Sequence, residues 1–282
     1  MDLIEDGGFT TDASANKEHP QVREEAEQGT LPDFLIIGTQ KGGTTFLYHL
    51  LRQHPDIEPA VRKEIHFFDS RRFKKGIDWY RSHFPRRHRE NGRRVITGEA
   101  SPYYLYHPLA AQRAAKIVPQ AKLITMLRNP VDRAFSDYQH RVRQEAEVLS
   151  FEQAIEAEDE RLQGEKEKIL ANASYRGRNH RRHSYLTRGV YVDQLREWHG
   201  FFDRDQMLVL KSEDFFERTV DTVRRVIDFL DLPDWKIVLP PAHYRNEGGY
   251  EQMKPATRQR LREYFEPHNQ RLYEYLGVDF GW

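Results

Sequence analysis

The stretch that most constrains the fold is residues 34–51, FLIIGTQKGGTTFLYHLL, in which a short apolar run is followed by a glycine-bearing loop and an amphipathic segment. Residues 34–37 have the composition of a strand buried in a parallel sheet, and the apolar residues within 45–51 follow helical spacing. The glycines let the loop backbone approach a ligand closely, and amides at the start of a helix can point at anion oxygens beside the charge of Lys41. The stretch therefore predicts a strand, a loop and a helix that together bind phosphate or sulfate.

This loop differs from a Walker A loop, which requires the pattern Gly-x-x-x-x-Gly-Lys-Ser/Thr. Here Gly43 is followed by Thr44, and Lys41 stands two residues before Gly43. Because the lysine is displaced, the pattern favours an anionic ligand other than the triphosphate of Walker A proteins.

A second strand and helix carry anion-binding side chains within residues 121–138, AKLITMLRNPVDRAFSDY. Residues 123–127 are strand-like, and Pro130 suits the first turn of a following helix. Arg128 therefore stands at the carboxyl end of a strand, where open α/β sheets bind ligands and where a magnesium-dependent NTPase usually places an aspartate. Ser136 follows about two helical turns later, so the sequence predicts that Arg128 and Ser136 bind one further anionic group.

Two anion sites of this kind resemble those of the sulfotransferases that use 3′-phosphoadenosine 5′-phosphosulfate (PAPS). The chain is most similar to the heparan sulfate type and its bacterial relatives. The likeness covers residues 32–282 and includes KEIHFFD at 63–69, RNPVDRAFSDY at 128–138, RGVY at 188–191 and PHN at 267–269. It implies a sulfotransferase fold, in which the first loop holds the 5′-phosphosulfate and the arginine and serine of the second motif hold the 3′-phosphate.

The resemblance also implies catalytic roles. It places the general base on Glu64, the stabilising cation for the leaving phosphate on Lys41, and His66 and Asp69 in the same cleft. Such a transfer uses no metal, and a well-placed base contributes roughly 100- to 10,000-fold. The residues expected to bind PAPS, or its product adenosine 3′,5′-bisphosphate, are Gln40, Lys41, Gly42, Gly43, Thr44, Thr45, Arg128, Ser136, Arg245, Gly248, Gly249 and Tyr250.

Other interpretations of these residues remain open at this stage. Residues 63–69 could form a solvated charge cluster, and His66 could be a packing histidine. The chain also departs from the heparan sulfate enzymes, since Ala100 stands where they commonly carry a lysine, and residues 244–250 offer only Arg245 as a positive charge. These departures weaken the case for a glycosaminoglycan acceptor.

Composition limits the domain organisation and the partners. Residues 1–30 hold eight acidic and two basic residues, a composition that predicts a disordered tail. The whole chain has 44 basic and 44 acidic residues, so residues 31–282 hold 42 basic and 36 acidic ones. We expect residues 31–282 to form one catalytic domain. No apolar run reaches the roughly 20 residues of a membrane helix, and the first six residues lack the features of a signal peptide. With no cysteine, thiol chemistry is excluded, and we expect a cytoplasmic protein, plausibly bacterial.

The middle of the chain is expected to lie near the acceptor. Residues 151–171 predict one charged helix, and the arginine-rich residues 172–188 predict either a lid or a solvated loop. Aromatic residues do not interleave with the arginines at stacking spacing, which argues against nucleic acid as a partner.

The sequence thus predicts an α/β fold, a P-loop-like and mainly parallel sheet flanked by helices, and a PAPS-dependent sulfotransferase. The expected acceptor is a hydroxyl of a small molecule, of a carrier-bound acyl chain or of a carbohydrate. The alternatives are a P-loop kinase or NTPase, which would depend on magnesium, and a non-catalytic nucleotide-binding module, in which Glu64 would have no catalytic effect.

Overall fold

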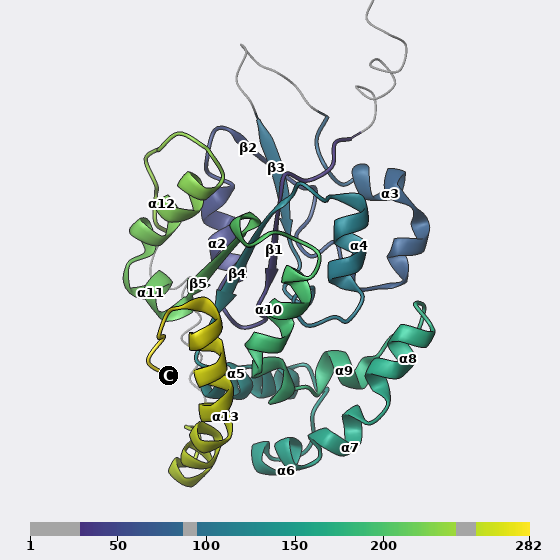
Figure 1. The fold of residues 1–282 in the computed structure, drawn as a ribbon, viewed down its shortest axis with the longest axis vertical. Helices are drawn as coiled ribbons and strands as arrows, with labels where there is room; N and C mark the ends of the chain where they lie inside the picture. Colours follow the sequence, from purple (N-terminus) through teal and green to yellow (C-terminus); the bar gives the residue numbers. More distant parts are fainter. Residues whose placement is uncertain (1–28, 87–94, 241–251) are drawn as a thin grey trace, which may run out of the picture.

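The fold was analysed in a computed structural model that describes residues 29–86, 95–240 and 252–282. Five strands of these residues form one parallel sheet, in the order β2-β3-β1-β4-β5 (Figure 1). They are β1 (Phe34–Gly38), β2 (Ile57–Pro59), β3 (Ile96–Ala100), β4 (Lys122–Leu127) and β5 (Met207–Lys211). Because every pairing is parallel, the carboxyl ends of the strands meet at one edge of the sheet.

The helices cover both faces of this sheet and its carboxyl edge. The α-helices are α2 (Thr44–Leu51), α3 (Ile77–Arg81), α4 (Ala110–Ile117), α5 (Pro130–Arg143), α6 (Phe151–Glu156), α7 (Glu158–Leu162), α8 (Glu165–Ala171), α9 (Arg178–Arg182), α10 (Tyr191–His199), α11 (Ser212–Glu217), α12 (Thr219–Phe229) and α13 (Pro255–Leu276). The 3₁₀ helices are η1 (Arg71–Lys75), η2 (Thr187–Gly189) and η3 (Arg204–Gln206). No helix in the described ranges combines the length and apolarity needed to cross a bilayer.

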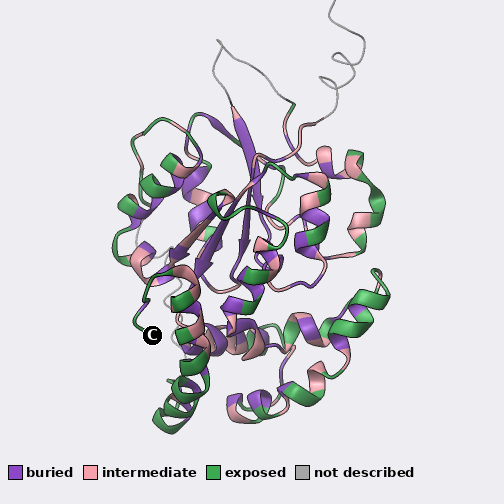
Figure 2. Cartoon of the chain, in the orientation of Figure 1, coloured by how far each residue is buried: buried purple, intermediate pink, exposed green. Residues whose placement is uncertain are grey.

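Alternate residues of β1 show how the two faces are filled. Leu35 and Ile37 belong to an apolar cluster with residues of α4 and α10, whereas Phe34 and Ile36 belong to a second cluster with residues of α2 and α12. All four side chains are fully buried, and β1, β3 and β4 are buried along almost their whole length (Figure 2). The predicted α/β fold, with a parallel sheet between helices, is therefore confirmed.

A third apolar cluster lies beside the carboxyl edge. Val131 of α5, Phe151 of α6 and Phe265 of α13 pack together there. In Figure 1 these helices, with α7 to α9, extend below the sheet. They form one wall for the loops that leave β1 and β4.

The prediction of one charged helix over residues 151–171 is wrong, because the structure has three short helices, α6, α7 and α8, in this range. Two of the expected solvated acids are buried. Glu158 accepts hydrogen bonds from the backbone of Leu186 and Thr187 over 2.7 and 2.8 Å, and Glu165 accepts one from Tyr175. The helical path is broken at Gln163, which has ψ 119°, and at Gly164, which has φ 69°, and the two buried carboxylates bond to residues beyond this range instead of facing solvent.

Candidate active site

The lysine loop, residues 39–43, leaves β1 in a tight conformation that only glycine permits at two positions. Gly43 has φ +95°, a left-handed value that strains other residues. Gly42 packs so closely that a Cβ atom would lie 2.5 Å from the carbonyl oxygen of Met126. Ser212 Oγ also donates to the carbonyl of Gly42 over 2.6 Å. The loop is therefore held against the ends of β4 and β5.

The lysine loop presents donors that have no hydrogen-bond partner among the described residues. The amides of Gly43, Thr44 and Thr45, where α2 begins, make no hydrogen bond to any described residue. The ammonium of Lys41 likewise makes no hydrogen bond or ion pair within residues 29–86, 95–240 and 252–282. Burial lowers the pKa of Lys41, while Asp137 opposes this effect. A set of free donors around a partly desolvated cation suits an anion.

Arg128 stands directly after β4, as its place in the sequence predicts. Its guanidinium donates to the carbonyl of Lys41 over 3.2 Å, and its own carbonyl accepts from Tyr191 Oη over 2.8 Å. The side chain of Asn129 caps α5 by accepting from two amides. Ser136 follows on α5, so both members of the second predicted anion site are anchored next to the lysine loop.

One cleft of about 1030 Å³ joins the lysine loop, the start of α5 and Glu64. The predicted site residues that line it are Gln40, Lys41, Gly43, Thr44, Thr45, Glu64, Arg128 and Ser136. A smaller hollow of about 390 Å³ lies at the amino ends of the strands, between Asp33, Ile96 and Lys122, and includes none of the predicted residues. The larger cleft, at the carboxyl ends, is therefore the candidate active site.

Behind the lysine loop, three buried arginines share one buried carboxylate. Arg133, Arg141 and Arg188 each approach an oxygen of Asp137 to 3.3 Å. Burial would raise the pKa of Asp137, but the three guanidiniums outweigh it and lower that pKa. Three cations against one anion leave this wall of the site positive.

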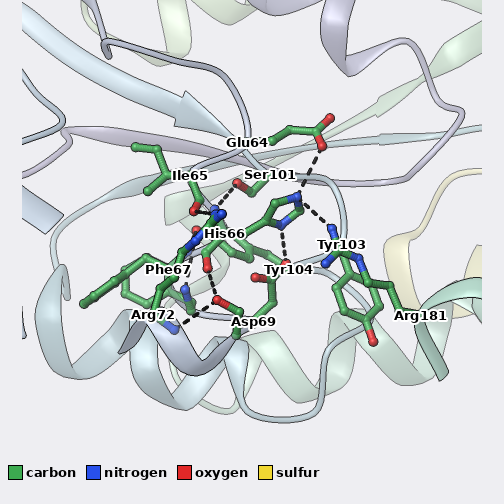
Figure 3. A network of polar contacts seen from close by, with 12 residues as sticks. Glu64, Ile65, His66, Phe67, Asp69, Arg72, Ser101, Tyr103, Tyr104 and Arg181 are labelled. Atoms are coloured by element: carbon green, nitrogen blue, oxygen red, sulfur yellow. Dashed lines mark hydrogen bonds and ion pairs between the residues drawn. The ribbon is translucent and has the colours of Figure 1, made fainter. Parts of the chain in front are cut away.

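The carboxylate loop, residues 63–69, carries a chain of ionisable side chains into the cleft (Figure 3). Glu64 contacts Lys63 Nζ over 2.7 Å through one oxygen and His66 Nε2 over 3.3 Å through the other. The other ring nitrogen, Nδ1, lies 2.7 Å from Asp69 Oδ2. Side-chain exposure falls along this chain from 41% for Glu64 to 12% for His66 and 0% for Asp69. Of these three side chains, only Glu64 is exposed enough to contact a ligand.

The backbone of this loop is strained where the functional side chains project. Glu64 and His66 have φ values of 61° and 54°, in the left-handed region that residues other than glycine seldom adopt. Lys41 has φ 73° in the facing loop. Such conformations persist only where the surroundings hold them, and they concentrate at functional sites.

The two central groups shift each other's ionisation. The hydrogen bond from His66 is the largest of the effects that lower the pKa of Glu64 to about 2; burial opposes it and Lys63 reinforces it. Burial lowers the pKa of His66, but hydrogen bonds to Asp69 and Glu64 outweigh burial and raise it to about 9. At pH 7 Glu64 is therefore an ionised carboxylate able to accept a proton.

A second buried carboxylate, Glu99 of β3, fixes the backbone of the carboxylate loop. It is fully buried and accepts from Tyr80 Oη (2.7 Å), Ser101 Oγ (2.7 Å) and Tyr104 Oη (2.9 Å). Because a carboxylate can only accept hydrogen bonds, the hydroxyl protons of Ser101 and Tyr104 point to Glu99, and the lone pairs of these hydroxyls face the carboxylate loop. These lone pairs accept from the amides of residues 66 and 67 over 3.2 and 2.9 Å.

Helix α9 and the segment after it reach the same site. Arg181 Nη2 lies 2.9 Å from His66 Nε2, and its guanidinium stands over the ring of Tyr103. The buried Arg188 donates to the carbonyls of residues 180 and 181 and to the side chain of Gln40 in the lysine loop. Part of the arginine-rich segment is thus a packed wall of the site rather than a solvated loop.

The predicted residues are therefore placed unequally. Glu64, Arg128 and Ser136 line the cleft together with residues 40, 41 and 43–45. Gly42 does not line it and packs against Met126, and His66 and Asp69 lie behind Glu64. Arg245, Gly248, Gly249 and Tyr250 lie outside the described residues. Sequence reasoning missed the roles of Glu99, Asp137 and Arg188; a glutamate inside an otherwise strand-like run, ITGEA, was the one available signal for Glu99.

Chemically, the cleft combines an ionised carboxylate with the cations of Lys41 and Arg128 and with amides that have no partner among the described residues, a set that suits an anion. This set can take a proton from one group while it stabilises negative charge that develops on another. Within the described ranges, no three histidine, aspartate or glutamate side chains are arranged to hold a metal ion.

Comparisons with known proteins agree with this chemistry. The family model described as "Sulfotransferase domain" matches residues 31–247. The membrane-associated sulfotransferase kil1 of Dictyostelium discoideum is 28% identical over 336 residues, covering 95% of this chain and 70% of its own. Heparan sulfate glucosamine 3-O-sulfotransferase 3B1 of Mus musculus is 32% identical over 276 residues, covering 89% of this chain and 65% of its own. The chain thus spans about two-thirds of the length of these curated relatives.

Among solved structures, a sulfotransferase from Alicyclobacillus acidocaldarius superposes with a TM-score of 0.68. It is 32% identical, and the match covers 89% of this chain and 98% of that one. The parallel sheet with its flanking helices is therefore the fold of a solved sulfotransferase.

Proposed function

The chain belongs to the sulfotransferase family, and we propose that it transfers a sulfuryl group from PAPS to an acceptor hydroxyl, with Glu64 as the general base. The observation that carries this proposal is that one cleft holds Glu64 together with Lys41, Arg128 and Ser136. A base thereby faces two anion-binding groups from different strand ends.

The residues present fit PAPS. The free amides of residues 43–45 and the unpaired Lys41 ammonium suit the 5′-phosphosulfate, and Arg128 with Ser136 suits the 3′-phosphate. The side chain of Gln40 is already bonded to Arg188, so its contribution would be to shape the loop. Arg245, Gly248, Gly249 and Tyr250 remain predicted contacts from a segment that the structure does not describe.

When bound, PAPS supplies the sulfuryl group. Glu64 takes the proton of the acceptor hydroxyl while the acceptor oxygen bonds to sulfur and the bond from sulfur to the phosphate oxygen breaks. Lys41 stabilises the negative charge on that oxygen, by the electrostatic logic of phosphoryl transfer and without a metal. The strained loops hold the base and the cation in place before the acceptor arrives.

The acceptor is proposed only by class: a small molecule, a carrier-bound acyl chain or a carbohydrate. The names of the relatives include both O- and N-sulfotransferases, since a Caenorhabditis elegans relative, 31% identical, is a bifunctional heparan sulfate N-deacetylase/N-sulfotransferase. An ionised carboxylate base suits a hydroxyl acceptor, which we favour. We further propose a single catalytic domain over residues 31–282 that acts in the cytoplasm.

Thermal unfolding with adenosine 3′,5′-bisphosphate in EDTA, beside ATP with magnesium, tests the donor site. At a hundred times the dissociation constant the bisphosphate should add about 2.7 kcal/mol, a melting shift of several degrees. Arg128→Ala should reduce this shift, whereas Arg52→Ala, at an exposed position after α2, should not. Stabilisation by magnesium ATP alone would replace the proposal with the kinase or NTPase alternative.

A further inference from the structure

Nε2 of His66 has two neighbours that make opposite demands on it. Glu64 Oε2, at 3.3 Å, can only accept a hydrogen bond, whereas Arg181 Nη2, at 2.9 Å, can only donate one. Nε2 therefore either carries a proton and bonds to Glu64, or presents a lone pair and bonds to Arg181. It cannot satisfy both groups at once.

Nδ1 of the same ring makes no such choice. It lies 2.7 Å from Asp69 Oδ2, and the Asp69 side chain is fully buried. The carboxylate of Asp69 requires Nδ1 to carry a proton. Loss of the Nε2 proton therefore gives one neutral form, protonated at Nδ1.

The position of Arg181 is fixed from several directions. Its guanidinium lies 5.5 Å from the centre of the Tyr103 ring, and its carbonyl accepts from Arg188 Nη2 over 2.8 Å and from Arg141 Nη2 over 3.4 Å. Arg188 is itself buried and bonded to Gln40. The contact with His66 therefore depends on the same buried arginine that holds the lysine loop.

The charged groups that face the His66 ring are the carboxylates of Glu64 and Asp69 and the guanidinium of Arg181. Lys63 pairs with Glu64, and Arg72 and the buried, neutral His107 lie near Asp69. The two carboxylates favour an imidazolium, and Arg181 disfavours it. An imidazolium would also set two donors against each other across 2.9 Å, so the shorter of the two Nε2 contacts belongs to the neutral ring.

We propose that Arg181 is a positioning residue that favours the neutral, Nδ1-protonated form of His66 and so leaves Glu64 free to accept the acceptor proton. This inference rests on the proposed function, because it concerns the base of that reaction. A carboxylate that already accepts from an imidazolium is a weak base. A carboxylate beside a neutral ring, whose Nε2 is occupied by Arg181, keeps an oxygen for the incoming hydroxyl.

Nitrogen-15 NMR of protein labelled in its histidines tests the ring directly. His66→Gln assigns the signals of His66 among the 13 histidines. When the ring of the wild type is neutral, Nδ1 should carry its proton and Nε2 should be unprotonated. Arg181→Met should raise the pH at which the His66 ring loses its proton, whereas Arg182→Met, an exposed neighbour on α9, should not. The same titration in the wild type and in Arg181→Met would overturn the proposal.

The pH profile of sulfuryl transfer gives a second test. In Arg181→Met a smaller fraction of the His66 ring is neutral at pH 7, so turnover should fall below that of the wild type at pH 7 and approach it as the pH rises through the titration of His66. Arg181→Lys, which keeps a donor, should restore part of the rate at pH 7. A loss that is equal at every pH would show that Arg181 acts only in structure.

The two tests separate the two proposals. The NMR measurement needs neither donor nor acceptor, so it decides the role of Arg181 even if no sulfuryl transfer is found. Absence of transfer to any hydroxyl would defeat the proposed function alone. Transfer with an unchanged ring in Arg181→Met would defeat the role of Arg181 alone.

Discussion

The lysine loop and the carboxylate loop meet at one cleft, but different parts of the chain hold them. The lysine loop runs from β1 into α2, and glycines and adjacent strand ends set its path. The carboxylate loop has no regular element within it, and its backbone is fixed by the buried Glu99 through hydroxyl groups. The proposed anion site can thus be encoded locally, whereas the proposed base depends on buried polar groups that lie far away in sequence.

The largest expected difference between the two loops concerns Glu64, the proposed base. Glu64→Gln keeps the size of the side chain but cannot take the acceptor proton, so the turnover number should fall by roughly 100- to 10,000-fold. Binding of adenosine 3′,5′-bisphosphate, measured by calorimetry, should stay within about twofold because the lysine loop is intact. Turnover within tenfold of the wild type would show that Glu64 is not the base, and a binding-only protein would show no turnover in either form.

Removal of the cation should affect the other loop. Lys41→Ala should lower the turnover number by roughly 100- to 1000-fold, the usual effect of losing one group that stabilises developing charge. The bisphosphate should also bind more weakly, unlike in Glu64→Gln. Lys74→Ala, at an exposed position in η1, is the matched control. A normal rate with weak binding would assign Lys41 to binding alone.

Glu99→Gln tests whether a buried carboxylate holds the carboxylate loop. The new amide would place a donor against hydroxyls that now donate, so the free energy of unfolding should fall by about 1–3 kcal/mol and turnover should fall with it. Rate measurements well below the melting temperature separate the two effects. Glu58→Gln, exposed on the neighbouring β2, should change neither quantity. Full activity in a destabilised Glu99→Gln would mean that the network serves stability only.

The smallest expected effect concerns Glu147, which bonds Arg161 and Tyr185 and so helps hold the wall that carries Arg181. Burial raises the pKa of Glu147, but Arg161, the Leu149 amide and Tyr185 lower it from 4.5 to about 2. A depressed pKa stabilises the fold above pH 4.5, and this stabilisation is lost as pH falls to 2. Between these values, Glu147→Gln should therefore lose less unfolding free energy than the wild type in urea titrations. Equal losses in the wild type and in Glu147→Gln would show that the contacts of Glu147 with Arg161 and Tyr185 add nothing to the free energy of unfolding.

The difference between locally encoded features and features that depend on other parts of the chain also decided what the sequence could predict. The strand, loop and helix around Lys41 and the position of Arg128 follow from apolar spacing and turn residues, which act over a few positions. The resemblance, rather than spacing, singled out Glu64. Arg188 escaped prediction because it bonds to Gln40, far away in the chain. Glu99 and Asp137 have several partners nearby in sequence, but apolar spacing and turn residues do not indicate that their charged side chains are buried. For the same reason the helix over 151–171 was wrong, since its buried carboxylates bond to residues 175, 186 and 187.

The three arginines around Asp137 have a consequence for the protein's resistance to proteolysis as well as for its chemistry. Their mutual repulsion is relieved only in part by one carboxylate, so a bound polyanion completes a charge balance that the chain leaves unfinished. A ligand that stabilises the native state in this way also reduces local opening. We expect the protein to resist proteases best when donor nucleotide is plentiful. Its abundance would then follow the supply of the nucleotide.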